Sequence, residues 1–297
     1  MGDRRSAEPW AMAGRAVLVT GATSGIGRAT ALALHAAGAT VLMHARTPER
    51  AADVVATVAA NGGPRPVPVS GDLGSLAGVH ALAAHVQEVA PGGLHVLVNN
   101  AGGAFAQRGF SPDGVERTLA VNHIAVAALT RVLLGALRDG AAASGRPSRV
   151  VNVSSSLERR GNPHLVDWSY PGRFSQFQAY CDAKLINLAY SYALAAEWAD
   201  IGVTVNSADP GSVATSFGRN SGGVFRMFQS LGRPLLATPE KGARTSIRLA
   251  ADPTLDSETG GYYRAGRPRT SSAVSRDPAF WERVRRRTAE VLGTPAP

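Results

Sequence analysis

The stretch Ala16-Val17-Leu18-Val19-Thr20, followed at once by Gly21-Ala22-Thr23-Ser24-Gly25-Ile26-Gly27, decides the fold that this chain can adopt. Its first part is a short apolar run typical of a buried strand, and residues 28–37 after it are rich in Ala and Leu, which favours a helix. A glycine turn between a strand and a helix lets a phosphate approach the free N–H groups at the helix start. No Gly-Lys-Ser/Thr sequence follows, which excludes a Walker-type loop. The stretch therefore predicts a nucleotide-binding unit.

The same alternation of apolar runs and helical stretches continues along the chain. Strands are predicted at 16–20, 40–44, 67–70, 94–98, 149–153, 203–206 and 261–263, and helices at 28–37, 49–60, 76–89, 114–137, around Tyr180, at 241–250 and at 278–292. Units of this length favour an α/β fold with a parallel, doubly wound sheet that has helices on both faces. Polar or glycine-rich clusters follow the strand ends, which right-handed crossovers place along one edge. We expect the functional site at that edge.

The end of the second predicted strand distinguishes between nicotinamide cofactors. In NAD-binding folds an acidic side chain about 20 residues after the glycine turn commonly binds the ribose hydroxyls. Here the sequence reads His44-Ala45-Arg46-Thr47, without an acid. An Arg can instead bind a 2′-phosphate through two hydrogen bonds, and Arg28 after the turn is a second candidate. The sequence therefore favours NADP(H) over NAD(H), against the alternative that Arg46 is a solvated surface residue.

The net charge of +9 raises the question of a nucleic-acid partner. Only Lys184 and Lys241 are lysines, so arginine supplies nearly all of the excess. These arginines are mostly scattered, and no aromatic-rich basic stripe accompanies them. We expect no nucleic-acid partner, and attraction of an anionic ligand instead.

The cysteine and histidine residues and the hydropathy of the chain bear on whether it is a disulfide-bonded, metal-binding or membrane protein. Cys181 is the single cysteine, which excludes an internal disulfide and suits a reducing compartment. The histidines are dispersed without metal-ligand spacing, so no metal site is expected. Because the first residues lack the apolar core of a signal peptide and no run of 18 apolar residues exists, we expect a cytoplasmic protein without an integral membrane segment.

Tyr180 and Lys184 are four residues apart on a predicted helix and so share one of its faces. An ammonium beside a phenol favours the phenolate and lowers the tyrosine pKa from about 10. Such a tyrosine could exchange a proton with an alcohol or carbonyl oxygen near neutral pH. The spacing alone is common, and a ring packed on an aliphatic stem is the simpler interpretation, so the other motifs must decide.

Residues 1–14 are a loose lead-in, and residues 15–297 are predicted to form a single domain. The segment at about 212–239 is irregular and carries aromatic and aliphatic residues among glycines. Loops of this kind often cover a ligand, so we interpret it as a substrate lid. A segment that rests on a membrane surface is the alternative, because arginines lie around the apolar residues.

Taken together, the motifs resemble those of the short-chain dehydrogenase/reductase family. They are, in order and spacing, Thr20-Gly21-x-x-x-Gly25-Ile26-Gly27, Asp72-Leu73, Asn99-Asn100-Ala101-Gly102, Asn122, Ser155, Tyr180-x-x-x-Lys184 and Pro210-Gly211. The resemblance covers roughly residues 15–265. It implies a single Rossmann-type domain with a seven-stranded parallel sheet flanked by helices.

The resemblance also implies roles for individual residues. Tyr180 would be the general acid/base, Lys184 would lower its pKa and bind the nicotinamide ribose, and Asn122 would support a proton-relay water. Ser155 would orient the substrate oxygen; alignment with the family selects it among three consecutive serines. The implied cofactor-binding residues are Gly21, Thr23, Ser24, Gly25, Ile26, Gly27, Arg46, Asp72, Leu73, Asn99, Ala101, Gly102, Tyr180, Lys184, Pro210, Gly211, Val213 and Thr215.

A long interval between Ser155 and Tyr180, with Asp167-Trp168 inside it, resembles the subgroup of retinol dehydrogenases, WW-domain oxidoreductases and protochlorophyllide reductase-like enzymes. Phe280-Trp281-Glu282 resembles the C-terminal helix of that subgroup, whose members usually prefer NADP(H). We expect no N-terminal anchor like theirs, and the 212–239 segment is less apolar, which argues against retinal as the natural substrate. The family often forms dimers or tetramers through its longest helices, so a homodimer or homotetramer is expected.

We therefore expect an NADP(H)-dependent oxidoreductase that transfers hydride between the nicotinamide and a carbonyl or alcohol of a small, hydrophobic molecule. The hydrophobic character is inferred from the predicted lid. The alternative is a catalytically silent nucleotide sensor or scaffold, against which the complete set Asn122, Ser155, Tyr180 and Lys184 argues. An epimerase or dehydratase would also use Tyr and Lys, but its usual G-x-x-G-x-x-G turn is absent.

Overall fold

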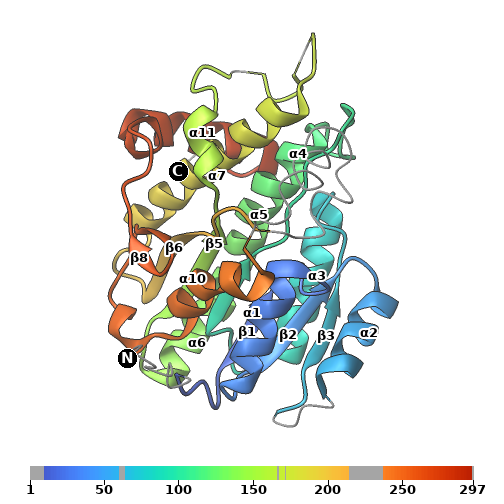
Figure 1. Ribbon diagram of the computed structural model, residues 1–297, viewed down its shortest axis with the longest axis vertical. Helices are drawn as coiled ribbons and strands as arrows, with labels where there is room; N and C mark the ends of the chain where they lie inside the picture. The colour runs from blue at the N-terminus through green and yellow to red at the C-terminus, as the bar shows by residue number, and fades with distance from the viewer. Residues whose placement is uncertain (1–9, 60–63, 166, 171, 214–236, 296–297) are drawn as a thin grey trace.

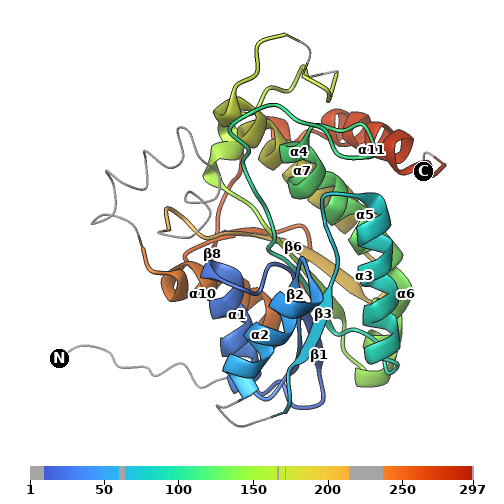
Figure 2. The same ribbon diagram turned by 90° about the vertical axis from the view of Figure 1, so that its right-hand side faces the viewer.

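The computed structural model describes residues 10–59, 64–165, 167–170, 172–213 and 237–295, and in this part a twisted sheet lies between two layers of helices (Figures 1 and 2). Its strands are β1 (Ala16–Val19), β2 (Thr40–Ala45), β3 (Val67–Ser70), β4 (Val96–Asn99), β5 (Ser148–Val153), β6 (Val203–Asp209), β7 (Tyr262–Arg264) and β8 (Arg267–Pro268). They are ordered β3-β2-β1-β4-β5-β6-β7-β8, and every neighbouring pair is parallel except β7 and β8. The predicted doubly wound, Rossmann-type sheet is confirmed.

One strand was not predicted. After β7 the chain turns back at Ala265-Gly266, where φ is +52° and +70°, and forms the two-residue β8 antiparallel to β7. Two positive φ values are typical of a two-residue hairpin turn. The described sheet thus has eight strands instead of the predicted seven.

The helices and single turns are α1 (Gly25–Ala36), α2 (Pro48–Ala59), α3 (Leu76–Val89), α4 (Arg117–Leu119), the π turn η1 (Ala120–Ile124), α5 (Ala125–Val132), α6 (Leu134–Ser144), the 3₁₀ turn η2 (Ser156–Arg160), α7 (Gln176–Glu197), α10 (Pro239–Ala251), η4 (Pro253–Leu255), η5 (Val274–Arg276) and α11 (Pro278–Leu292). Figure 2 shows α1, α2 and α10 on one side of the sheet and α3, α5, α6 and α7 on the other. Four helices begin at a side chain that accepts a backbone N–H group of the first turn. These caps are Ser75 on α3, Ser175 on α7, Thr238 on α10 and Asp277 on α11.

Alternate strand residues supply two apolar cores, because successive side chains point to opposite faces. Leu18 and Leu42 belong to the core beneath α3, α5 and α7, whereas Val17 and Met43 belong to the core beneath α1, α2 and α10. A parallel sheet covered on both faces needs apolar residues at successive positions. This explains why the strands appear in the sequence as unbroken apolar runs.

The predicted single helix at 114–137 is wrong. Glu116 starts the first turn by accepting the N–H groups of Thr118 and Leu119, and the π turn η1 follows. The two parts on either side of Leu133 are then bent by 53°. In α6, a Cβ on Gly140 would overlap with the carbonyl of Leu94, so this helix lies directly against the start of β4. The bend brings α6 into that contact.

The C-terminal helix α11 covers α7, which is buried at 17 of its 22 residues (Figure 1). Thr288 of α11 is hydrogen bonded to Nε2 of His123 at 2.8 Å. Glu197 at the end of α7 forms ion pairs with Arg131 at 3.0 Å and with Arg285 of α11 at 3.3 Å. An oligomer built on the outer face of α7 would therefore have to displace α11.

Among the described residues, no single helix is long and apolar enough to cross a membrane. The bent pair Arg117–Val132 and Leu134–Ser144 meets the criteria of length and composition only when its two parts are counted together.

Candidate active site

The glycine turn lies between β1 and α1, at the carboxyl edge of the sheet. Gly21 and Gly25 have φ values of +66° and +57°, a left-handed backbone that favours glycine. A Cβ on Gly27 would overlap with the carbonyl of Gly21 and with the side chain of Asn100. The turn is thereby held tight against the start of α1, whose first turn contains no acidic residue. A phosphate group fits this arrangement, because the helix N-terminus presents N–H groups and a partial positive charge.

Asn100, which belongs to the predicted motif but was given no role there, ties this turn to β4. Its Nδ2 donates a hydrogen bond to the carbonyl of Thr20 at 2.8 Å. Its backbone N–H and that of Ala101 both donate to Oγ1 of Thr20, each at 2.9 Å. Asn100 therefore shapes the turn, and the second polar side chain at the strand end was the sequence signal for it.

Asn99, a predicted cofactor-binding residue, points its side chain away from the turn. Its Nδ2 donates to Oγ1 of Thr130 and to Oδ1 of Asn152, both at 2.9 Å. The side chain joins β4 to α5 and β5 and is buried. Any contact between Asn99 and a cofactor is left to the backbone.

His44 at the end of β2 is a second residue to which the sequence prediction gave no role. Its Nδ1 accepts the N–H of Gly21 at 3.1 Å, and its Nε2 lies 2.9 Å from the carbonyl of Gly71. Since an N–H only donates and a carbonyl only accepts, the ring is neutral with its proton on Nε2. Burial lowers the pKa of His44 and favours the same form. His44 therefore holds the glycine turn and the end of β3 at a fixed separation.

Arg46 and Asp72 face each other beyond the ends of β2 and β3. Nε of Arg46 lies 3.8 Å from Oδ1 of Asp72, and the two side chains are 68% and 59% exposed. So exposed a pair contributes little to stability, and the guanidinium is accessible to a second anion. Leu73 beside them is buried. Arg28, the second candidate for the 2′-phosphate, donates a hydrogen bond to Oγ1 of Thr57 at 3.5 Å.

Tyr180 and Lys184 project from α7 toward the end of β5, where they meet Ser155. The Tyr180 hydroxyl lies close enough to the side chain of Ser155 for that group to lower its pKa. Nζ of Lys184 lies 5.6 Å from the centre of the Tyr180 ring and donates to the carbonyl of Val153 at 2.9 Å. The structure thus brings together the serine, tyrosine and lysine predicted from the sequence.

The structure also distinguishes among the three consecutive serines. Ser154 is buried, and its hydroxyl has no partner among the described residues. Ser156 lines a neighbouring cavity. Ser155 lies near Tyr180, whose pKa it lowers, and its hydroxyl accepts the N–H of Leu157 at 3.2 Å.

Burial changes the acidity of both side chains on α7. It lowers the pKa of Lys184 to about 8, an effect that the carboxylate of Asp209 partly offsets. Burial raises the pKa of Tyr180 above its ordinary value, the nearby Ser155 side chain lowers it, and Asp209 raises it further. The expected lowering by Lys184 is therefore not met by the polypeptide alone, because burial is the largest influence on the pKa of Tyr180. Tyr180 is held as a neutral phenol.

Asn122 lies in the π turn η1, close to Lys184. Its Nδ2 donates to the carbonyls of Gly103 at 2.6 Å and Thr118 at 2.7 Å, whereas Oδ1 is buried without a partner among the described residues. A Cβ on Gly102 would lie 2.6 Å from this oxygen and 3.9 Å from Nζ of Lys184. The three residues therefore surround one small space, where the unpaired oxygen can accept a hydrogen bond from a hydroxyl or a water.

The loop after β6 returns to the glycine turn. Asp209 accepts the N–H of Gly211 on Oδ1 at 2.8 Å, which bends the chain at Pro210. A Cβ on Gly242 of α10 would lie 2.7 Å from Val213 and 3.3 Å from Ile26. Ile26 and Val213, far apart in sequence, thus lie near the same point of α10. Thr215 and most of the predicted lid at 212–239 lie outside the described residues.

Cys181 is buried, and burial raises its pKa to about 12, so the thiol is inert near neutral pH. Within the described ranges, no group of three His, Cys, Asp or Glu residues could hold a metal ion.

The chain is similar in sequence to known dehydrogenases. The family model described as short chain dehydrogenase matches residues 15–222. Human retinol dehydrogenase 14 is 36% identical over 278 residues, which cover 88% of this chain and 81% of that protein. Mouse polyprenol dehydrogenase is 37% identical over 275 residues, covering 91% and 82%. These matches confirm the resemblance predicted from the motifs.

Solved structures agree with the fold. A protein from Mycobacterium paratuberculosis superposes with a TM-score of 0.76 at 26% identity, covering 97% of both chains. The NADP complex of Pseudomonas aeruginosa RhlG gives 0.67 at 28% identity and covers 90% of this chain and 99% of that one. A 3-ketoacyl-(acyl-carrier-protein) reductase from Brucella melitensis complexed with NADH gives 0.66 at 25% identity, covering 85% and 96%.

Proposed function

Because the chain belongs to the short-chain dehydrogenase family, we propose that it is an NADP(H)-dependent oxidoreductase that interconverts a carbonyl compound and the corresponding alcohol. The observation that carries this proposal is the assembly of Ser155, Tyr180 and Lys184 at the end of β5. The bound nicotinamide would supply or accept the hydride. The chain's own residues bind the two reactants, orient the oxygen and move its proton.

Tyr180 is the proton donor in the reducing direction. Its phenol is neutral, so as hydride reaches the carbonyl carbon the O–H proton passes to the substrate oxygen, which becomes the alcohol. Ser155 hydrogen bonds that oxygen and stabilises its developing charge. The oxidising direction needs the phenolate, and the proton then moves from the alcohol to Tyr180.

Lys184 and Asn122 hold the nicotinamide end of the cofactor and pass protons. The ammonium remains mostly charged below pH 8 and has N–H groups left for a ribose hydroxyl besides its bond to Val153. The unpaired Oδ1 of Asn122 lies near the space that the ribose and a relay water would share. The predicted nicotinamide contacts also include the segment that follows β6, with Pro210, Gly211, Val213 and Thr215.

The preference for NADP(H) rests on Arg46. The exposed guanidinium can form two bonds to a 2′-phosphate, and β2 ends without an acid that would repel it. Asp72 and Leu73 beside it would contact the adenine, and the glycine turn with Thr23, Ser24 and Ile26 would hold the pyrophosphate. The complexes with NADP and with NADH among the solved relatives are compatible with either cofactor.

A hydrophobic substrate, as expected from the segment at 212–239, remains a proposal that rests on sequence alone. It is consistent with relatives named for retinol and polyprenol. A homo-oligomer also remains a proposal, and since α11 covers α7 its interface would lie elsewhere on the surface. No observation favours the silent sensor or scaffold.

The test is to follow nicotinamide absorbance with NADPH and with NADH against a panel of aldehydes, ketones, alcohols and quinones. We expect carbonyl reduction with a higher kcat/KM for NADPH. Oxidoreductase function is contradicted if the purified protein binds NADPH but turns over no member of the panel. A higher kcat/KM with NADH would contradict only the assignment of Arg46.

A further inference from the structure

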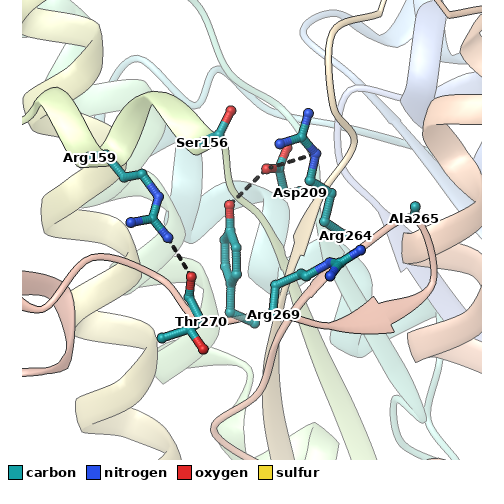
Figure 3. Close-up of a pocket in the computed structure, with 8 residues that line it drawn as sticks. Ser156, Arg159, Asp209, Arg264, Ala265, Arg269 and Thr270 are labelled. Carbon is teal, nitrogen blue, oxygen red and sulfur yellow. Dashed lines mark hydrogen bonds and ion pairs between the residues drawn. The ribbon is translucent and has the colours of Figure 1, made fainter.

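A cavity of about 310 Å³ opens beside the catalytic residues, at the carboxyl ends of β6 and β7 (Figure 3). It is lined by Ser156, Arg159, Asp209, Tyr262, Arg264, Ala265, Arg269 and Thr270. A volume of this size is at the lower end of small-molecule sites. Neither the motifs nor the predicted lid accounts for it.

Three arginines surround this space. Figure 3 shows Arg159 on one side and Arg264 and Arg269 on the other. Arg159 comes from η2, whereas Arg264 ends β7 and Arg269 follows β8. The hairpin turn between β7 and β8 brings the latter two together, about a hundred residues after Arg159 along the chain.

Little in the described part of the chain neutralises these charges. Arg159 donates to the carbonyl of Thr270 and lies 3.9 Å from Glu158, but that buried carboxylate is already bonded to the N–H and hydroxyl of Ser272. The side chain of Arg269 has no hydrogen bond or ion pair with another described residue. The cavity therefore has two guanidinium groups, on Arg159 and Arg269, with unused donors.

Asp209 at the base of the cavity is already paired. It is 1% exposed, and its Oδ2 accepts the Tyr262 hydroxyl at 2.8 Å and lies 3.8 Å from Nε of Arg264. Its Oδ1 accepts the N–H of Gly211. With both oxygens occupied, Asp209 acts as a fixed counter-charge, and the cavity keeps a positive excess.

The position of the cavity separates it from the phosphate-binding part of the cofactor site. The glycine turn follows β1 and Arg46 follows β2, whereas the cavity follows β6, β7 and β8. Ser155 and Tyr180 lie between these two regions in the strand order, at the end of β5. Ser156, which lines the cavity, follows Ser155 in the chain, and Asp209 of the cavity is near enough to Tyr180 and Lys184 to raise the pKa of both. The cavity therefore lies next to the catalytic residues.

We propose that this cavity binds an anionic group, a carboxylate or a phosphate, of the same molecule whose carbonyl carbon accepts hydride beside Tyr180. Arg159 and Arg269 supply the bonds to the anion, and Arg264 adds charge while paired with Asp209. This inference rests on the proposed oxidoreductase function and narrows its substrate class.

The test compares three aldehydes of matched shape with NADPH: para-carboxybenzaldehyde, its neutral methyl ester and para-formylphenyl phosphate. We expect the better of the two anions to exceed the ester in kcat/KM by about tenfold or more, the range of one charge-assisted hydrogen bond. Whichever anion is preferred shows whether carboxylate or phosphate is the natural group. The difference should decrease at high salt, because the arginines are partly exposed.

Arg269→Met should remove most of this preference by raising KM for the anions, with little change in kcat or in the ester's kcat/KM. Arg286→Met on α11 is the control, because it removes the same charge from an exposed position away from the cavity. If none of the three aldehydes is reduced, benzoate and benzamide are compared as inhibitors of the best carbonyl substrate in the panel. Benzoate should then inhibit at about tenfold lower concentration in the wild type but not in Arg269→Met.

Equal kcat/KM for the anions and the ester, or equal inhibition by benzoate and benzamide, would overturn the anion site while leaving the oxidoreductase function intact. Equal losses for anions and ester in Arg269→Met would do the same. Failure to reduce any carbonyl compound would instead contradict the proposed function itself. The two failures are therefore distinguishable.

Discussion

Replacing Lys184 by Met is expected to stabilise the protein without cofactor while removing most of its activity. Burial lowers the pKa of Lys184 from 10.5 to about 8, which corresponds to a cost of about 3 kcal/mol for keeping the ammonium in the folded state. Since the unfolded chain binds this proton more tightly, the cost is fully present below pH 8 and disappears as the pH rises toward 10.5. Loss of the hydrogen bond to Val153 offsets about 1 kcal/mol of the gain.

The net stabilisation should therefore be about 2 kcal/mol near neutral pH, or an increase in Tm of roughly 4–6 °C for a chain of this size. Urea and thermal unfolding of the cofactor-free protein, followed by far-UV circular dichroism, measure it. Turnover should fall by roughly 100-fold or more. The only other lysine, Lys241, is exposed on α10, so Lys241→Met is a matched control that should change neither stability nor turnover. A Lys184→Met protein less stable than the wild type would refute the reasoning.

Three further predictions follow from the cofactor site and the core. Gly27→Ala places a methyl group against Gly21 and Asn100, so it should lower the free energy of unfolding by about 1–3 kcal/mol and weaken NADPH binding. Unfolding and binding titrations measure both effects, and Gly135→Ala is the control, because nothing lies near that position. Arg46→Leu should raise the Kd of NADPH about 10- to 100-fold and leave that of NADH unchanged, and an equal effect on both would contradict the 2′-phosphate contact. Burial lowers the pKa of His123 from 6.5 to about 3, so the unfolded chain binds the extra proton. The free energy of unfolding should therefore fall by about 1.4 kcal/mol per pH unit below pH 6.5. Urea unfolding should show a shallower pH dependence for His123→Gln than for the wild type. The same pH dependence in both proteins would contradict the assignment of this effect to His123.

The sequence predicted most of the fold because each strand of a parallel sheet is buried on both faces and therefore appears as an apolar run. The break at Leu133 could not be predicted in the same way. Leucine favours a helix, and the bend depends on a contact between Gly140 and Leu94, which are far apart in sequence. The short strand β8 was also missed, because two exposed residues carry no hydrophobic pattern.

Within the site, the spacing of Tyr180 and Lys184 predicted which side chains meet, but not their acidity. The pKa of Tyr180 depends on desolvation by surrounding elements, which a helix-face argument omits. The roles of His44 and Asn100 were missed because each residue acts on the glycine turn from a different strand. The arginines of the cavity come together only through the β7–β8 hairpin, which no local pattern indicates.

The Tyr180→Phe variant tests whether Tyr180 moves the proton of the substrate oxygen. The measurement is the rate of NADPH-dependent reduction of the best carbonyl substrate together with the Kd of NADPH. Tyr192→Phe, at a residue of α7 bonded to Ser271, is the control. We expect Tyr180→Phe to lose roughly 100-fold or more in kcat while the Kd of NADPH changes by less than about twofold. A variant that keeps the wild-type kcat would contradict this role of Tyr180.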